Sequence, residues 1–378
     1  MNIAVNTRLL LPGKLEGLGR FSYETLKRIT KKHPEHNFTF IFDRKFSDEF
    51  IFSDNINPVI ANPQARHPIL WYLYFNWGVP LALKQCKADL FFSPDGWLSL
   101  RTNVPSLPVI HDLNFFHNPE WVEWAPKKYY NYFFPKFIKK ATRIATVSEF
   151  SKNDIIQRFD YHKNKIDVVC NGSSKGFEPL KEDEQNKVRN KYTAGKEFFL
   201  FVGLIHPRKN LARIIMAFDK FKSSTESPVK LLIVGSNKYM TSDVDKAHKS
   251  SKSKHDILFT GRLPDRELKR VTASALALVY ASLFEGFGIP ILEAMHCDTP
   301  IITSDITSMP EVGGEAVLYV DPYSPDSIAT AFVKIAKNSE FRNKLISAGR
   351  KQRKKFSWDQ TSELVWDSIE KTVKSIKT

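Results

Sequence analysis

The sequence predicts an α/β protein made of two doubly wound, Rossmann-like domains. Apolar strand-like runs alternate with helical stretches along the chain, and this alternation favours parallel sheets covered on both faces. The order strand, loop, helix opens each half, first at residues 2–29 and again at residues 198–221. A length of 378 residues is enough for two domains of ordinary size.

The composition is that of a soluble globular protein, with 42% hydrophobic and 26% charged residues. The chain opens directly on a strand-like pattern, so we expect no signal peptide. Its most apolar stretch, residues 68–83, is short and interrupted by polar and helix-breaking residues, so it does not meet the requirement for a membrane-spanning helix. Three widely spaced cysteines, without a CxxC pair, indicate reduced thiols in a cytoplasmic protein.

The net charge of +15 fits an anionic substrate, an anionic membrane surface or nucleic acid. Residues 115–140 mix aromatic side chains with lysines. Such a segment can be a helix with an aromatic core face and solvated lysines, a membrane-interface helix, or a platform for single-stranded nucleic acid. The segment alone does not choose between these alternatives.

The first half contains a glycine loop and a histidine in positions typical of a ligand site. Gly17 and Gly19 lie in the loop between a strand at residues 2–6 and a helix at residues 21–29. Further strands are expected at residues 38–42, 89–94 and 104–110, and His111 directly follows the last of them. Ligands of open parallel sheets bind beyond the carboxyl ends of strands, so His111 is a candidate site residue.

The polar stretch at residues 181–195 is the expected domain boundary. We therefore expect an N-terminal domain at residues 1–185, a C-terminal domain at residues 190–355 and a terminal helix at residues 356–378. Ser357 is a suitable N-cap for this helix. Apolar residues recur at helical spacing along it, at Val365, Ile369, Val373 and Ile376.

The most informative stretch is residues 281–295, which follows an expected strand at residues 275–280. Gly286 and Gly288 form a loop, and Pro290 suits the first turn of the helix that follows. Such a helix start offers unpaired backbone N–H groups to a phosphate. Glu285 lies in the loop, and Glu293 is expected in the first helical turn.

Basic residues complete the pattern in the loop after the strand at residues 198–203. Arg208 and Lys209 suit a diphosphate, and a carboxylate suits the hydroxyls of a ribose. Together they indicate a nucleotide diphosphate that carries another group. Asp243 and Asp245 form an Asp-x-Asp motif away from any strand end, so we expect no metal ion there and charge stabilisation by the cations instead.

Four segments together resemble family 4 glycosyltransferases, most strongly over residues 198–322. They are Gly-Leu-Ile-His-Pro-Arg-Lys-Asn at 203–210, the Glu-x7-Glu stretch at 285–293, and residues 304–313 and 147–152. These enzymes are retaining, usually metal-independent and of the GT-B fold. The resemblance implies two Rossmann-like domains that face a central cleft, with the acceptor bound by the N-terminal domain and the nucleotide sugar by the C-terminal domain. It also implies a C-terminal helix that crosses back to the first domain.

The resemblance also implies residue roles. Glu293 would hold the donor ribose, Glu285 would contact the hydroxyls of the transferred sugar, and Arg208 and Lys209 would neutralise the departing diphosphate. His111 would lie near the sugar. The remaining expected donor-site residues are Gly17, Gly19, Arg262, Leu263, Gly286, Phe287, Gly288 and Ile289.

The expected function is retaining transfer of a hexose, with mannose mildly preferred, from a nucleotide diphosphate sugar such as GDP-mannose or a UDP-sugar. The expected acceptor is a hydroxyl of a glycan or lipid-linked glycan in cell-surface polysaccharide or lipopolysaccharide synthesis. We expect no cofactor, no metal, no nucleic-acid partner, and at most peripheral contact with the inner face of an anionic membrane. The alternatives are a nucleotide-sugar 2-epimerase of the same fold and a non-catalytic basic protein that binds membrane or nucleic acid.

Overall fold

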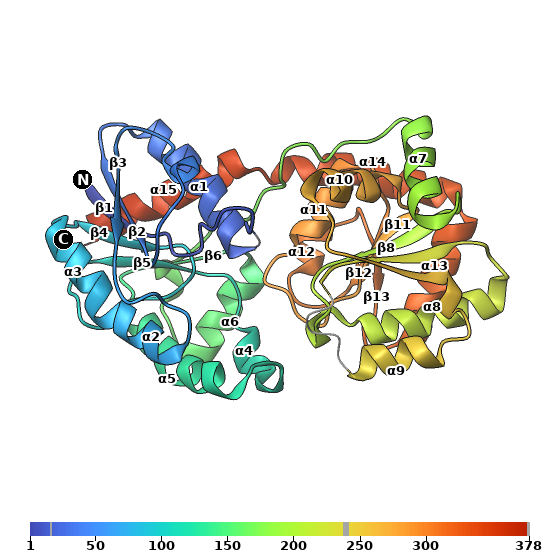
Figure 1. Ribbon diagram of the computed structural model, residues 1–378, viewed down its shortest axis with the longest axis horizontal. Helices are drawn as coiled ribbons and strands as arrows, with labels where there is room; N and C mark the ends of the chain where they lie inside the picture. Colours follow the sequence, from blue (N-terminus) through green and yellow to red (C-terminus); the bar gives the residue numbers. More distant parts are fainter. Residues whose placement is uncertain (16, 237–241, 376–378) are drawn as a thin grey trace. The chain divides into compact units, whose positions relative to one another are not determined.

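The computed structural model describes residues 1–15, 17–236 and 242–375, which form two compact units (Figure 1). Unit 1 consists of Met1–Gly172 together with Ser357–Thr378, and unit 2 of Ser173–Phe356. Ile376, expected on the apolar face of the terminal helix, lies outside the described residues.

Unit 1 is built on a parallel seven-stranded sheet with the order β3-β2-β1-β4-β5-β6-β7. The inner strands β2, β4 and β5 are almost entirely buried and rich in aliphatic and aromatic residues, as expected for a parallel sheet covered by helices. The strands are β1 (Asn2–Asn6), β2 (Asn37–Phe42), β3 (Ile56–Ile60), β4 (Leu90–Ser93), β5 (Ser106–Ile110), β6 (Ile144–Thr146) and β7 (Ile166–Val168).

The helices of unit 1 include the C-terminal helix of the chain. They are α1 (Leu18–Lys32), α2 (Pro68–Leu73), α3 (Val79–Gln85), α4 (Asn114–His117), α5 (Trp124–Lys140), α6 (Glu149–Phe159) and α15 (Trp358–Lys374). Helix α15 runs beside α1 (Figure 1), and ion pairs of 2.8 Å join Arg28 to Asp359 and Lys32 to Glu363.

The N-terminal end of α15 agrees with the sequence. The Ser357 side chain accepts a hydrogen bond from the backbone N–H of Gln360, so it is the predicted N-cap. Val365 and Ile369 are buried and Val373 is half-buried, which confirms the apolar face of this helix over the described residues. Trp358 lies so close to Gly172 that a Cβ there would meet its backbone nitrogen at 2.3 Å.

Unit 2 is built on a parallel six-stranded sheet with the order β10-β9-β8-β11-β12-β13. Its strands are β8 (Phe198–Val202), β9 (Lys230–Val234), β10 (Ile257–Gly261), β11 (Ala277–Tyr280), β12 (Ile301–Ser304) and β13 (Leu318–Val320). Its helices are α7 (Glu182–Thr193), α8 (Leu211–Thr225), α9 (Ser242–Ser250), α10 (Asp265–Ser274), α11 (Ile289–His296), α12 (Met309–Gly313), α13 (Pro325–Lys337) and α14 (Ser339–Gln352).

Both sheets reverse their strand order at one point, and the predicted doubly wound α/β architecture is thereby confirmed. In unit 1 the reversal lies between β1 and β4, and in unit 2 between β8 and β11. Loops that leave the carboxyl ends of the two strands at such a switch point diverge to opposite faces of the sheet, and ligands bind in the crevice between them. The strand order thus marks where a site in each unit has to be sought.

The division between the units falls earlier than the polar stretch at residues 181–195 suggested. That stretch is the helix α7, which is fixed to α10 of unit 2. Lys191 and Tyr192 contact Glu267 at 2.6 and 2.8 Å, and Arg270 pairs with Glu184 at 2.7 Å. The polar composition reflects these surface ion pairs rather than a linker.

The aromatic segment at residues 115–140 is divided between core and surface. Tyr129, Phe134 and Phe137 are buried in the core of unit 1. Trp124 and Tyr132 are 70% and 59% exposed. No helix in the described parts of the chain is both long and apolar enough to cross a membrane.

Candidate active site

The loop after β8 presents two cations at the switch point of unit 2. Pro207–Lys209 form a single 3-10 turn, whose first N–H, that of Arg208, donates to Nδ1 of His206 at 3.3 Å. Asn210 follows in the left-handed conformation, and its side-chain amide donates to the carbonyl oxygens of Ala281 and Pro322 at 3.0 and 2.6 Å. This loop is therefore tied to the end of β11 and to the chain beyond β13.

Glu285, from the loop after β11, binds both cations. Its Oε2 accepts from Nη1 of Arg208 at 2.8 Å and its Oε1 accepts from Nζ of Lys209 at 2.6 Å. The glutamate is only 6% exposed, and Arg208 is the more accessible of the two cations. The cluster carries two positive charges and one negative charge, so it keeps a net attraction for an anion.

The charges of this cluster keep Glu285 ionised. Burial raises the pKa of Glu285, but the positive charges of Arg208 and Lys209 outweigh burial and hold the pKa below its ordinary value. Breaking such a buried pair leaves an uncompensated charge, which typically costs about 3–5 kcal/mol.

Tyr280, the last residue of β11, completes the environment of Lys209. Its hydroxyl accepts from Nζ at 2.6 Å, and its ring lies below the ammonium, 4.4 Å from Nζ to the ring centroid. Burial, followed by the charge of Glu285, raises the pKa of Tyr280 well above its ordinary value, so the hydroxyl stays protonated. Lys209 is thus held from two sides.

The glycine loop leads directly from Glu285 into α11. Gly288 is the N-cap residue, with φ of +104°, a conformation that side-chain-bearing residues rarely adopt. A Cβ at Gly288 would also lie 3.2 Å from Cδ1 of Ile291. The hydroxyl of Ser308 lies 2.9 Å from the carbonyl oxygen of Glu285 and 3.1 Å from that of Phe287, and can donate to either.

Glu293 lies on α11, and Arg262 lies in the loop after β10. Helix α11 begins at Ile289, so Glu293 lies just past the first turn of about 3.6 residues, one position later than expected. Arg262 and Leu263 follow β10, which is two strands away from β8 in the sheet, an offset of about 10 Å.

His111 directly follows β5 in unit 1, as predicted. Its Nε2 lies 2.9 Å from the carbonyl oxygen of Pro94 and therefore donates to it, and its ring meets that of Phe21 edge-on at 4.9 Å. Burial lowers the pKa of His111, against smaller opposing effects of the Pro94 carbonyl and nearby carboxylates. The hydroxyl of Ser151, in the first turn of α6, fixes the His111 carbonyl at 3.2 Å.

Gly17 and Gly19 open α1 in unit 1. Gly17 is the N-cap residue with φ of +45°. A Cβ at Gly19 would lie 2.8 Å from the carbonyl oxygen of Leu9, so this helix approaches the loop after β1 as closely as a glycine permits.

The structure thus brings Arg208, Lys209, Glu285 and the Gly288 loop together in unit 2. In unit 1 it places the His111 ring against Phe21 of α1, the helix that the glycine loop precedes. The sequence does not single out Tyr280 as a site residue, because it ends an apolar strand and such residues usually belong to the core. Its position as the last residue of β11, directly before the Glu285 loop, was the available signal.

The Asp-x-Asp motif forms no shared ligand set. Asp245 pairs with Lys249 at 2.6 Å within α9, and residues two apart on a helix point to different sides. In the described ranges no group of three or more His, Cys, Asp or Glu residues has the geometry to hold a metal ion.

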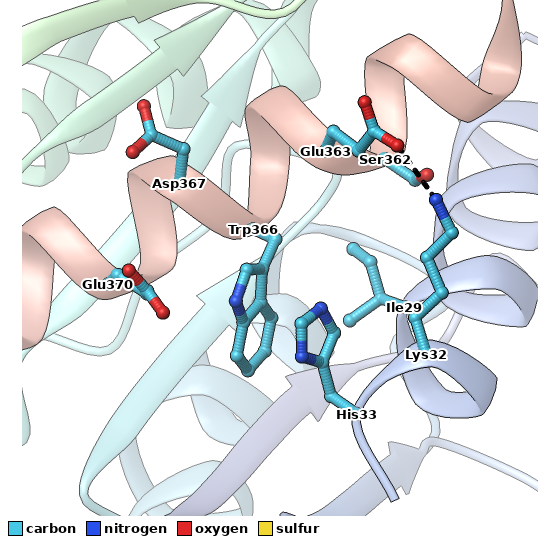
Figure 2. Close-up of a pocket in the computed structure, with 8 residues that line it drawn as sticks. All are labelled: Ile29, Lys32, His33, Ser362, Glu363, Trp366, Asp367 and Glu370. Atoms are coloured by element: carbon cyan, nitrogen blue, oxygen red, sulfur yellow. Dashed lines mark hydrogen bonds and ion pairs between the residues drawn. The ribbon is translucent and has the colours of Figure 1, made fainter.

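Unit 1 also contains a cavity of about 400 Å³ (Figure 2). It is bordered by the end of α1 and by α15, where His33 stacks on Trp366 with ring centroids 3.6 Å apart. Helix α1 runs back from the carboxyl end of β1, so its last turn lies toward the amino ends of the strands. The neighbouring His36 accordingly lies 3.2 Å from the terminal amine of Met1. This cavity is not part of a switch-point site.

The two Rossmann-like units, with paired cations and a glycine-started helix at a switch point, are those of a GT-B glycosyltransferase. Two family models match the chain: "Glycosyltransferase Family 4" over residues 15–174 and "Glycosyl transferases group 1" over residues 182–352. The chain belongs to the family 4 glycosyltransferases. Neither the family models nor the relatives of this chain support the two alternatives, a nucleotide-sugar 2-epimerase and a non-catalytic binding protein.

Curated relatives resemble this chain over most of its length. O-antigen chain mannosyltransferase B of Escherichia coli is 28% identical over 91% of this chain and 93% of its own. O-antigen chain mannosyltransferase RfbU of Salmonella typhimurium is 28% identical over 82% of each chain.

Solved structures share the fold at lower identity. Sucrose-phosphate synthase from Thermosynechococcus elongatus matches with a TM-score of 0.79 and 15% identity over 99% of both chains. WaaG, a glycosyltransferase involved in lipopolysaccharide biosynthesis, matches with a TM-score of 0.74 and 15% identity, covering 97% of this chain and 98% of its own. Anabaena HepE, solved in complex with UDP and glucose, matches with a TM-score of 0.76 and 14% identity, covering 98% of this chain and 100% of its own.

Proposed function

We propose that this glycosyltransferase transfers a hexose, with mannose favoured, from a nucleotide diphosphate sugar to a hydroxyl of a glycan or lipid-linked glycan, with retention of the anomeric configuration. The observation that carries the donor assignment is the placement of Arg208 and Lys209 at the switch point of unit 2, beside the loop that starts α11. The preference for mannose, and a place in O-antigen or other cell-surface polysaccharide synthesis, rest on the similarity to the O-antigen mannosyltransferases.

The proposed donor pose follows the sheet. The diphosphate would bind Arg208, Lys209 and the first N–H groups of α11, because these donors surround the crevice between β8 and β11. Glu293 would accept hydrogen bonds from the ribose hydroxyls. The base would extend toward Arg262 and Leu263, because the offset of about 10 Å between β10 and β8 leaves room for a nucleoside.

The role that we propose for Glu285 differs from the one that the family resemblance implies, which is contact with the sugar hydroxyls. Its two carboxylate oxygens are both used by Arg208 and Lys209. We therefore propose that it first orients these cations and reaches the sugar hydroxyls only when the diphosphate takes over part of its pairing. This exchange would couple donor binding to the arrangement of the sugar.

The proposed chemistry is attack on the front face of the donor sugar. The acceptor oxygen forms a bond to C1 as the bond from C1 to the phosphate oxygen breaks on the same side. The acceptor proton passes to the departing phosphate oxygen, and a nucleoside diphosphate is released. Charge builds up on that phosphate, and preorganised cations stabilise such charge without a metal ion.

A panel of nucleotide sugars tests this proposal. One or more donors should raise the thermal unfolding temperature, and the same donor should give a transferred product whose anomeric configuration, read by NMR, matches the donor. Addition of EDTA should leave the rate unchanged if Arg208 and Lys209 supply the positive charge. Inverted product, or a rate that disappears with EDTA and returns with Mg²⁺ or Mn²⁺, would contradict the corresponding part of the proposal.

We also propose peripheral contact between unit 1 and an anionic membrane. Trp124 and Tyr132, the exposed aromatics of α5, each carry a lysine over the ring: Lys128 at 4.2 Å and Lys136 at 3.4 Å. Ring contacts continue from Tyr132 through Phe133 to the chain around α2. An aromatic ring with a cation above it suits the headgroup region of an anionic bilayer.

Vesicle flotation tests this contact. Vesicles with anionic phospholipid should retain the protein at low salt and release it at high salt, while purely zwitterionic vesicles should retain less. Trp124→Ala should weaken retention, and Tyr323→Ala, which removes a 59% exposed aromatic of unit 2, should not. Equal retention by both vesicle types at all salt concentrations would refute it.

A further inference from the structure

Three aromatic rings of unit 1 form a row that ends on His111. The ring of Phe21, the fourth residue of α1, meets the His111 ring edge-on, with centroids 4.9 Å apart and an interplanar angle of 90°. Phe21 also meets the indole of Trp358, the first residue of α15, at 6.2 Å and 70°. Both are favourable edge-to-face geometries. We call His111, Phe21 and Trp358 the His111 row.

The His111 ring is restrained at two points. Its Nε2 donates to the carbonyl oxygen of Pro94 at 2.9 Å, which fixes one ring nitrogen, and the contact with Phe21 restricts the tilt of the ring. His111 is half-buried, whereas Phe21 is only 1% exposed. Phe21 therefore forms a buried support behind a ring that solvent, and hence a ligand, can reach.

Trp358 gives the row a fixed end. A Cβ at Gly172 would meet the backbone nitrogen of Trp358 at 2.3 Å, so the start of α15 lies directly on the chain that follows β7. One turn further along, the hydroxyl of Thr361 donates to the carbonyl oxygen of Cys170 at 2.5 Å. These contacts hold the start of α15, and with it the indole that supports Phe21.

Packing rather than hydrogen bonding holds the indole. Trp358 is 3% exposed, and its buried Nε1 finds no hydrogen-bond partner among the described residues. A buried donor without a partner is unfavourable, so the size and the aromatic character of this side chain are what the site uses. A phenylalanine can supply part of both.

We propose that Phe21 and Trp358 are positioning residues that hold the His111 imidazole in the orientation in which it meets the transferred sugar. Both act through His111 and need not touch the sugar themselves. The C-terminal helix would thus contribute to the site as well as to the stability of unit 1. This inference rests on the proposed glycosyl transfer, in which His111 lies near the sugar.

Trp358→Leu tests the inference, and Trp366→Leu is the matched control. Trp366 is a 9% exposed tryptophan of the same helix that stacks on His33. His33 lies twelve positions after Phe21, about 18 Å further along α1. Both substitutions weaken the packing of α15 on α1, but only the first removes support from Phe21.

NMR and steady-state kinetics supply the two measurements. The imidazole proton resonances of His111 are assigned by their absence from His111→Gln. In Trp358→Leu these resonances should shift, because the Phe21 ring beside them moves, and kcat should fall by about fivefold with little change in donor KM. Trp358→Phe should recover most of both properties. Trp366→Leu should change neither, even where its melting temperature falls as far as that of Trp358→Leu.

Unchanged His111 resonances in Trp358→Leu, or an equal fall in kcat in Trp366→Leu, would overturn the inference. If Trp358→Leu does not fold, Phe21→Leu decides the matter: a lowered kcat supports the inference, and a wild-type kcat overturns it. If the wild-type protein transferred sugar from no nucleotide sugar, the proposed function would fail, while the resonances of His111 would still show whether Trp358 positions its ring.

Discussion

The ammonium Nζ of Lys209 lies 2.6 Å from Oε1 of Glu285, and this pair joins the two loops that flank the switch point of unit 2. The carboxylate simultaneously holds Arg208, so one buried anion organises both cations. The donor phosphates would meet a site whose positive charges are already positioned, which is the condition for electrostatic stabilisation without reorganisation.

Removal of the carboxylate should damage both activity and stability. Glu285→Ala leaves Arg208 and Lys209 unbalanced, so we expect turnover to fall by about two orders of magnitude or more and the free energy of unfolding to fall by about 3–5 kcal/mol. Steady-state kinetics and urea denaturation measure the two effects. Asp326→Asn, at an exposed pair with Lys220, should change stability by less than about 1 kcal/mol; equal effects of both substitutions would contradict this.

Tyr280 should act through Lys209. Tyr280→Phe keeps the ring but removes the hydroxyl that accepts from Nζ, so the ammonium loses one restraint. We expect kcat to fall by about tenfold with a smaller change in donor KM. Tyr319→Phe is the control, because the hydroxyl of Tyr319 donates to the carbonyl oxygen of Gly314 at 2.7 Å and contacts neither Lys209 nor Glu285. An unchanged kcat in Tyr280→Phe would show that the Tyr280 hydroxyl does not position Lys209 for catalysis.

Gly288 should be intolerant of a side chain. Gly288→Ala must hold φ near +104° and bring its Cβ close to Ile291, so stability should fall by about 1–3 kcal/mol and donor affinity should fall with it. Gly13→Ala has a positive φ of +66° but no atom within 4 Å of the added Cβ. Gly13→Ala should therefore lose stability alone, and a loss of donor affinity there as well would argue against a specific role for Gly288.

His111 should make stability depend on pH. Burial lowers its pKa in the folded protein, whereas the unfolded chain has a pKa of about 6.5. Between these two values the unfolded state binds more protons, so stability falls as the pH drops below about 6.5. His111→Gln lacks this pH-dependent loss, and the contributions of the other histidines are the same in both proteins and cancel. The difference in unfolding free energy between wild type and His111→Gln should therefore shrink from pH 7.5 to pH 5.5. A difference that grows over this range would have the wrong sign.

The sequence predicts the fold class and singles out Arg208, Lys209 and Glu285, but it does not show that these residues meet. The alternation of strands and helices predicts parallel sheets, and the spacing from Glu285 to Gly288 marks a loop that starts a helix. The strand order is not contained in such patterns, since it depends on which strands pair across the sheet. Only that order places Arg208, Lys209 and Glu285 at one switch point.

Two features could not be foreseen because their side chains look ordinary in sequence. Arg8 is a lone arginine after a strand, and it forms a buried ion pair with Asp95, which lies 87 residues further along the chain. The helix α7 looks like a linker because its polar side chains form ion pairs with α10. Both depend on long-range contacts rather than on local pattern.

Titration of GDP and UDP into the wild-type protein and into Arg208→Ala tests the central claim most directly. The account predicts saturable binding of at least one of these nucleotides by the wild type, and binding at least about tenfold weaker by Arg208→Ala because a charge-assisted contact to phosphate is lost. Binding of neither nucleotide by the wild type, or equal affinity in Arg208→Ala, would contradict a donor site at the switch point of unit 2.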